Sequence, residues 1–109
     1  LRLSTLTSFA AKNNLKGWEV ITGVPATLGG AVVMNAGTSL GEIGSLVKRV
    51  WIIDNKGQSR TIEIDDESFS YRKNNFLKSN EIIYQVELVN NGKDENVSEV
   101  IRNYLKKRN

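Results

Sequence analysis

Small, uncharged residues gather between Thr22 and Gly37, in the stretch TGVPATLGGAVVMNAG. It includes the chain's single proline, Pro25, but no histidine, cysteine or charged side chain that could act as a nucleophile, general base or metal ligand. Its glycines allow positive φ angles and let a ligand approach the main chain closely. The stretch therefore predicts either a backbone cradle for a phosphate or a ring edge, or a tight turn that lets a helix pack closely on a sheet.

Residues 27–35 of this stretch are expected to form a compact helix that begins just after Pro25. Free amide groups at the start of such a helix would attract an anion. The sequence is not a P-loop, because it lacks Gly-Lys-Ser/Thr, and it does not contain the G-x-G-x-x-G dinucleotide fingerprint. The residues alone therefore leave the ligand open.

Tyr71 and Arg72, in the segment SYRKNN, follow an acidic turn and precede a strand. An arginine at such an edge can hold a carboxylate or a phosphate through two hydrogen bonds. The alternative is a surface ion pair with the acidic residues 65–67, which contributes little stability. Spacing alone favours the surface ion pair.

Glu42 is a lone carboxylate between glycines in the segment LGEIG. It is expected to be a solvated loop acid.

The strands that must position these residues are predicted from composition and turn signals. Residues 46–54 and 58–65 are rich in β-formers and flank an Asn-Lys-Gly turn, which predicts a hairpin. Residues 81–89 predict another strand, and residues 18–24 a short β-like run that ends at Pro25.

The helices are predicted from apolar spacing and from the distribution of charge. The segment 3–17 has helical spacing with Gly17 as its stop, and residues 94–109 have acids first and bases last, as the helix dipole favours. Asp65 or Asp66 is expected to cap a short helical turn. Together the elements predict an α+β fold, an antiparallel sheet flanked by helices.

Composition limits the class of protein. The 109 residues are enough for one domain, and 39% hydrophobic with 25% charged residues argues against disorder. The absence of cysteine and histidine excludes a disulfide framework and a Cys/His zinc site, so we expect no metal site. The absence of cysteine also fits a protein of the reducing cytoplasm.

Charge and hydropathy indicate which classes of partner are not expected. The net charge of +3 arises largely in residues 102–109, which are more typical of a solvated helix end than of a nucleic-acid site. No apolar run approaches the ~18 residues that cross a bilayer, so we expect neither nucleic acid nor membrane as a partner. Because the chain starts without methionine, we expect residues 1–109 to be a single partial domain of a longer protein.

The order of the motifs resembles the UDP-N-acetylenolpyruvoylglucosamine reductase family, flavoenzymes that complete UDP-N-acetylmuramate synthesis for peptidoglycan. The resemblance is carried, from about Leu15 onward, by GWEVITGVPATLGGAVVMNAG, GEIG, SYRKNNF and IIYQVEL. It implies an FAD-linked oxidase fold, of which the chain covers most of the second FAD-binding part. It also implies FAD as cofactor, NADPH as hydride donor, a UDP-sugar substrate, and the rest of its own chain as partner.

The resemblance also assigns roles to residues. Arg72 matches the catalytic arginine, and Tyr71 its neighbour near the substrate. The residues that match the cofactor-binding segments are Gly23, Val24, Pro25, Ala26, Thr27, Val33, Met34, Asn35, Ala36 and Gly37. Alternatives are the corresponding part of another FAD-linked oxidase, or a small anion-binding module.

Two positions depart from the family pattern. Ala26 replaces a usual glycine, so a positive φ there would be costly, and Thr38-Ser39-Leu40 replaces the commoner Ala-Tyr-Gly. The family's catalytic serine and glutamate have no counterpart in these residues. We therefore expect the chain alone to be inactive.

Overall fold

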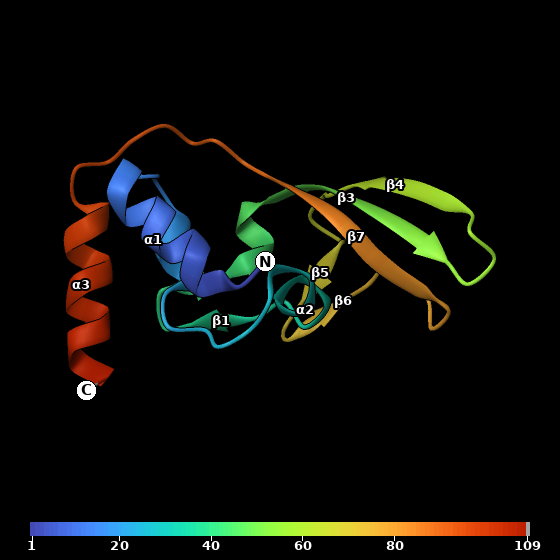
Figure 1. Cartoon of the computed structure of the whole chain (residues 1–109), viewed down its shortest axis with the longest axis horizontal. Helices are drawn as coiled ribbons and strands as arrows, with labels where there is room; N and C mark the ends of the chain where they lie inside the picture. Colours follow the sequence, from blue (N-terminus) through green and yellow to red (C-terminus); the bar gives the residue numbers. More distant parts are fainter. Residues whose placement is uncertain (109) are drawn as a thin grey trace.

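The computed structural model describes residues 1–108, an elongated molecule of 44 × 28 × 24 Å whose two longest helices lie at one end and whose largest sheet lies at the other (Figure 1). The helical end is formed by α1 (Leu3–Asn13) and α3 (Val97–Arg108), which pack side by side. In the described chain, no helix combines the length and apolar character needed to cross a membrane.

A three-stranded antiparallel sheet forms the other end, with the strand order β4-β3-β7. Its strands are β3 (Val47–Asp54), β4 (Ser59–Glu63) and β7 (Glu81–Leu88), which confirms the predicted hairpin and the predicted later strand. On β3, Val50 and Ile52 are completely buried and form the sheet's part of the core. The pairing of β3 with β7 has two register shifts, between Val47 and Arg49 and between Trp51 and Ile52.

Two further pairs of strands are separate from this sheet. The first pairs β1 (Gly37–Thr38) with β2 (Gly41–Glu42), and the second pairs β5 (Phe69–Ser70) with β6 (Lys73–Asn74). All three sheets are antiparallel and are accompanied by helices, so the α+β class is confirmed. The single sheet that the sequence predicted is divided into three.

Asn14 joins the two long helices. It takes a left-handed conformation (φ 51°) and ends α1 before the predicted stop at Gly17. Its carbonyl accepts from Asp94 N at 2.9 Å and its Oδ1 from Ser98 N at 3.2 Å. These bonds fix the start of α3, at Val97 rather than at residue 94.

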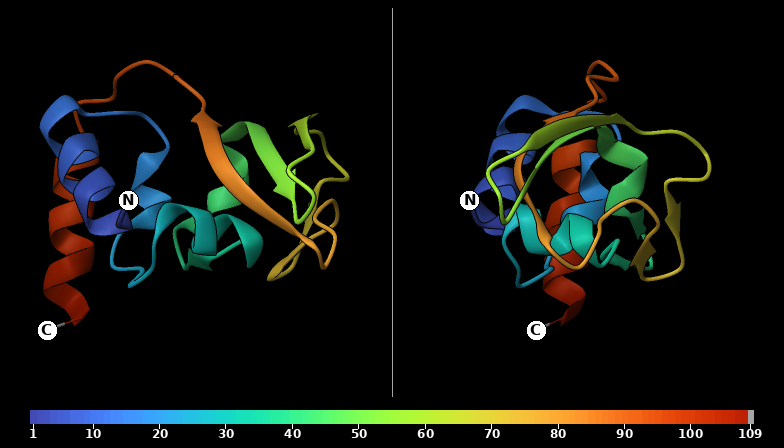
Figure 2. Two further views of the ribbon diagram at one scale, coloured as in Figure 1. Left: turned by 45° about the vertical axis from the view of Figure 1, so that its right-hand side comes forward. Right: turned by 90° about the vertical axis from the view of Figure 1, so that its right-hand side faces the viewer.

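The predicted β-like run at residues 18–24 is wrong. The segment Trp18–Ile21 forms a 3₁₀ helix, η1, between glycines with φ angles of 90° (Gly17) and 76° (Gly23). A strand would send alternate side chains to opposite faces, whereas three residues per turn place Trp18 and Ile21 on one side. Both are buried, and η1 contacts α1 and α3 on one side and β1 and β2 on the other. Figure 2 shows this segment between the helical end and the strands.

Two shorter elements lie beside the small strand pairs. The helix α2 (Leu28–Val33) is capped by Thr27, whose Oγ1 accepts from Gly30 N at 3.2 Å, and the 3₁₀ helix η2 (Ile43–Leu46) follows β2. Asp65 caps a short turn, as the sequence predicted: its Oδ1 accepts from Glu67 N at 2.9 Å and its carbonyl from Ser68 N at 3.2 Å.

Arg60 on β4 reaches past β3 to Glu81 on β7. Its Nε and Nη2 each lie 2.7 Å from a carboxylate oxygen of Glu81, and Nη2 also donates to Phe76 O at 2.7 Å. The Glu81 side chain is only 6% exposed. The hydrogen bonds from Arg60, with further help from the Lys78 amide, lower the pKa of Glu81 to about 2. This fork therefore ties both outer strands together.

We predict that the Arg60–Glu81 pair makes the stability depend on pH below about 4.5. The unfolded chain takes up a proton at the ordinary carboxyl pKa of about 4.3, whereas the folded chain does so only near 2. The stabilisation is complete above this window and is lost as the pH falls through it. Arg60→Met should raise the pKa of Glu81 and flatten this dependence, measured by urea denaturation from pH 7 to 2.

Arg102→Met is the matched control, because Arg102 is exposed on α3. It should keep the wild-type acid dependence. An equal loss of stability with falling pH in the Arg60→Met variant and the wild type would contradict the prediction.

Candidate functional site

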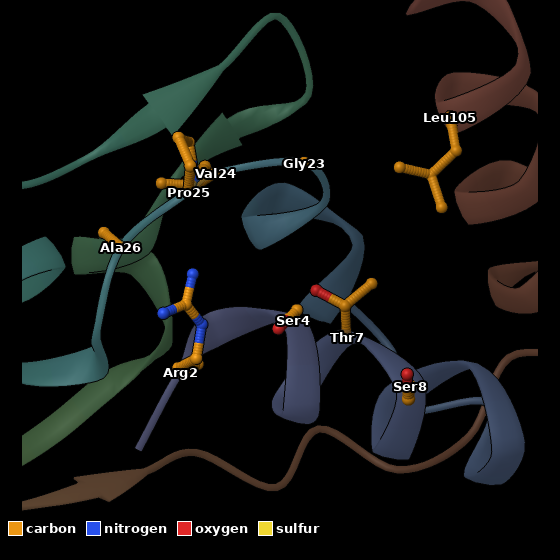
Figure 3. Close-up of a pocket in the computed structure, with 9 residues that line it drawn as sticks. All are labelled: Arg2, Ser4, Thr7, Ser8, Gly23, Val24, Pro25, Ala26 and Leu105. Carbon is orange, nitrogen blue, oxygen red and sulfur yellow. The ribbon is translucent and has the colours of Figure 1, made fainter. Parts of the chain in front are cut away.

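The segment Gly23–Ala26 lines a cavity of about 350 Å³ between α1 and α3. Figure 3 shows the Arg2 side chain directed into this cavity, with Thr7 on α1 and Leu105 on α3 along its walls. Arg2 is the only charged residue of the lining, which contains no carboxylate. The cavity is therefore suited to an anionic or electron-rich group.

Two of the amide groups at the start of α2 are not free to bind the anion that the sequence suggested as one alternative. The Leu28 amide donates to Leu1 O at 2.7 Å and the Gly30 amide to Thr27 Oγ1. Because the chain's own oxygens satisfy these donors, they are not available to an anion. The positive charge beside Gly23–Ala26 comes from Arg2 instead.

Gly23 has the positive φ (76°) that a glycine allows, but the other left-handed residues of the site are not where the sequence suggested. Ala26 does not have a positive φ, so the glycine-to-alanine departure carries no backbone strain. Positive φ angles occur instead at Asn35 (46°) and Arg72 (54°). Such angles are uncommon for residues other than glycine, asparagine and aspartate, and both residues belong to the predicted site.

Tyr71 and Arg72 form the two-residue turn between β5 and β6. Tyr71 is 79% exposed, and the Arg72 guanidinium carbon lies 5.1 Å from the centre of its ring. Arg72 Nη1 donates to Asn35 O over a long 3.5 Å. Among the described residues, no ion pair joins Arg72 to the acids at 65–67, so the surface-pair interpretation favoured by spacing is wrong.

Asn35 brings this turn to the end of α2. Its Nδ2 donates to Glu42 Oε2 at 2.6 Å and to Ser70 O at 2.9 Å, while its Oδ1 accepts from Gly44 N at 2.9 Å. The residue is only 4% exposed. A single buried carboxamide therefore connects four segments of the chain.

Glu42 is not the solvated acid that the sequence favoured. It is half-buried in β2 and paired with the Asn35 amide. Its residue type gave no signal of this partner, which lies seven positions earlier. Beside it is an open cavity of about 420 Å³, whose other polar walls include Asp65, Asp66 and Ser70.

Two glycines make room for these contacts. A Cβ on Gly37 would lie 2.5 Å from Gly41 O and 3.0 Å from Arg72 Nη1. On Gly44 it would lie 2.7 Å from Asn35 Oδ1 and 2.9 Å from the Phe69 ring. At Gly37 the small residue thus allows a close approach of β2 and Arg72, rather than the helix–sheet packing that the sequence suggested.

The predicted site residues lie at the two ends of α2. The segment Gly23–Ala26 and the cap Thr27 are at its start, with Arg2, which sequence reasoning missed because nothing marks it. The segment Val33–Gly37 is at its end, with Tyr71 and Arg72. Met34 is 58% exposed there. The described residues hold no acidic cluster that could bind a metal ion.

Comparisons with known proteins find relatives that share one name. The reductase named UDP-N-acetylenolpyruvoylglucosamine reductase of Clostridium tetani is 32% identical over 107 residues, 97% of this chain and 35% of that protein. Those of Rickettsia akari and Borreliella burgdorferi are 38% and 40% identical over 84% and 77% of the chain, and over 31% and 28% of their own lengths. No family model matches.

A solved structure agrees with these relatives. The crystal structure of UDP-N-acetylenolpyruvylglucosamine reductase (MurB) from Thermus caldophilus matches 98% of the chain and 40% of its own, with a TM-score of 0.85 and 30% identity. Over this segment the chain is homologous to the UDP-N-acetylenolpyruvoylglucosamine reductases. The chain spans about a third of the length of these curated relatives, so it corresponds to one part of a reductase.

We predict opposite effects for the same substitution at two glycines of this reductase segment. Gly44→Ala should destabilise the fold by about 1–3 kcal/mol, because the new methyl group meets the Asn35 amide and the Phe69 ring. Gly29→Ala is the control: no atom lies within 4 Å of its Cβ, and it is in α2. It should stabilise the fold by about 0.5–1 kcal/mol, as measured by urea denaturation at pH 7. Equal effects would contradict the contacts around Asn35.

Proposed function

We propose that residues 1–109 are the second FAD-binding part of a UDP-N-acetylenolpyruvoylglucosamine reductase that acts in peptidoglycan synthesis. The homology over 97% of the chain supports this family. The observation that carries the proposal is the contact between the Tyr71–Arg72 turn and Asn35 at the end of α2. This contact places the proposed substrate residues beside the proposed cofactor segment. The proposal includes a cytoplasmic location and a longer chain that supplies the remaining parts.

The chain's residues fit an FAD molecule. The lining of the Gly23–Ala26 cavity has one cation, Arg2, and no carboxylate, which suits a nucleotide diphosphate or ring edge. Thr22 Oγ1, adjacent in sequence to Gly23, is buried and has no hydrogen-bond partner in the described structure. The helix α2, which is about 9 Å long, separates this cavity from the Val33–Gly37 segment. An extended dinucleotide is long enough to contact both ends.

FAD would supply the hydride chemistry, with NADPH as its reductant, and the protein would supply position and charge. Arg72 is exposed at the tip of its turn, so its donors are accessible to a carboxylate. A guanidinium held there would stabilise negative charge that develops on an enolpyruvyl group during reduction. Tyr71, which stacks beside Arg72, would contact the UDP-sugar substrate from the same turn.

We predict that the isolated chain does not reduce the enolpyruvyl substrate. The serine and glutamate that the family resemblance implies are outside these residues, and half of a cofactor site binds with fewer contacts to offset association costs. NADPH oxidation, followed by absorbance with FAD and substrate present, should not exceed the rate without protein. Turnover near that of a complete reductase would overturn the assignment as a partial domain.

We predict that Arg72 is needed for activity in a complete enzyme. For the test, this chain replaces the matching segment of the Thermus caldophilus reductase, with which it shares 30% identity. The resulting chimera is the complete enzyme in which the variants are made. Arg72→Lys should lower kcat by about 10²–10³-fold, because a lysine cannot reproduce a bidentate contact. Flavin absorbance checks that the cofactor is still bound.

Arg49→Lys is the matched control, since Arg49 lies on the sheet, paired with Glu63 and Glu87. It should leave kcat within a factor of two or so of the unmodified exchange. Full activity of the Arg72→Lys variant would contradict the proposed role. An unmodified exchange that binds FAD but never reduces the substrate would contradict the proposed function itself.

A further inference from the structure

We propose that Asn35 is a positioning residue, whose buried carboxamide holds the Tyr71–Arg72 turn and so orients the Arg72 guanidinium. The role rests on the proposed function insofar as Arg72 acts on a substrate. The structural part of it stands on the contacts of this chain alone. It differs from the cofactor contact that the resemblance implied for this residue.

The Asn35 side chain has little capacity left for a ligand. A carboxamide has two N–H donors, and those of Asn35 are directed to Glu42 Oε2 and Ser70 O. Its oxygen accepts from Gly44 N. These partners also fix the orientation of the amide, because a flipped group would bring its oxygen against two acceptors. Contact between this residue and a cofactor is therefore left to its main chain.

Two bonds connect Asn35 to the turn that carries Arg72. The first, from Nδ2 to Ser70 O, holds the last residue of β5 immediately before the turn. The second runs from Arg72 Nη1 to Asn35 O at 3.5 Å. The side chain thus holds the base of the turn, while the carbonyl receives the guanidinium.

The backbone around Asn35 is shaped for these contacts. The φ of 46° at Asn35 turns the chain at the end of α2 and leaves its side chain among β2, η2 and β5. The glycines at 37 and 44 leave space for the guanidinium and for the carboxamide, respectively. Asparagine meets both requirements here: it tolerates a left-handed φ, and it has two donors and an acceptor.

The test measures the order of individual arginine side chains in the ¹⁵N-labelled chain by NMR relaxation at the Nε–Hε group. In Asn35→Asp the acceptor is kept and both donors are lost, and in Asn35→Gly the left-handed backbone is kept without a side chain. In both variants the order parameter of Arg72 should fall below about 0.6, the range of flexible groups. Arg60, held by Glu81, is the internal reference and should not change.

Asn14→Gly is the matched control. Asn14 is also left-handed (φ 51°) and also accepts a backbone amide, from Ser98, but it lies at the α1–α3 contact. It should leave the order of Arg72 unchanged, even if the fold loses stability. Where the Asn35 variants do not fold, Glu42→Ala removes one partner of Nδ2 and should lower the Arg72 order parameter in part. An unchanged Arg72 in every folded variant at Asn35 or Glu42 would overturn the proposal.

A second measurement separates this proposal from the proposed function. In the exchanged Thermus caldophilus reductase, Asn35→Asp should raise KM for the enolpyruvyl substrate about tenfold with the flavin spectrum unchanged. If Arg72→Lys is fully active while the Arg72 order parameter still depends on Asn35, the proposed function fails and the positioning role stands. If Arg72 is needed but its order does not depend on Asn35, the positioning role fails.

Discussion

The site depends on the hydrogen bonds of one buried carboxamide, that of Asn35. This group joins the end of α2 to β2, η2 and the β5–β6 turn. All of these elements are short. A buried polar group without partners costs about 1–3 kcal/mol, so the alternatives to this arrangement are disfavoured. Because the Asn35 carboxamide needs these partners, β2, η2 and β5 must lie close to the end of α2.

The composition of the opening stretch follows from that constraint. Gly37 lies in the strand that passes directly beneath Arg72 and against β2, where any side chain would meet backbone atoms. Gly44, just beyond the stretch, faces the carboxamide and the Phe69 ring. At the other end of α2, the segment Gly23–Ala26 has small residues because it lines a cavity. Close contacts thus account for the glycines at 37 and 44, whereas a ligand-facing backbone at Gly23–Ala26 stays a prediction.

Local signals were sufficient for the elements that carry their own turn, spacing and end-charge patterns. The hairpin of β3 and β4 and the helix α3 follow from turn residues, apolar spacing and end charges, and the structure contains both. The segment Trp18–Ile21 was misassigned because its β-branched residues have to fill a space set by distant elements. Tertiary packing overrides the propensity of such short runs.

The candidate site was predictable in its residue types but not in its pairings. Arg72 has nearby acids in sequence, yet the left-handed turn directs it to Asn35 O instead of to residues 65–67. Glu42, which could have neutralised a neighbouring cation, is engaged by the Asn35 amide at 2.6 Å. The carboxamide therefore has two partners around the turn: it bonds Ser70 O at the base of the turn, and it bonds one carboxylate oxygen of Glu42. In the proposed positioning role, this arrangement holds the turn while Arg72 stays exposed at its tip.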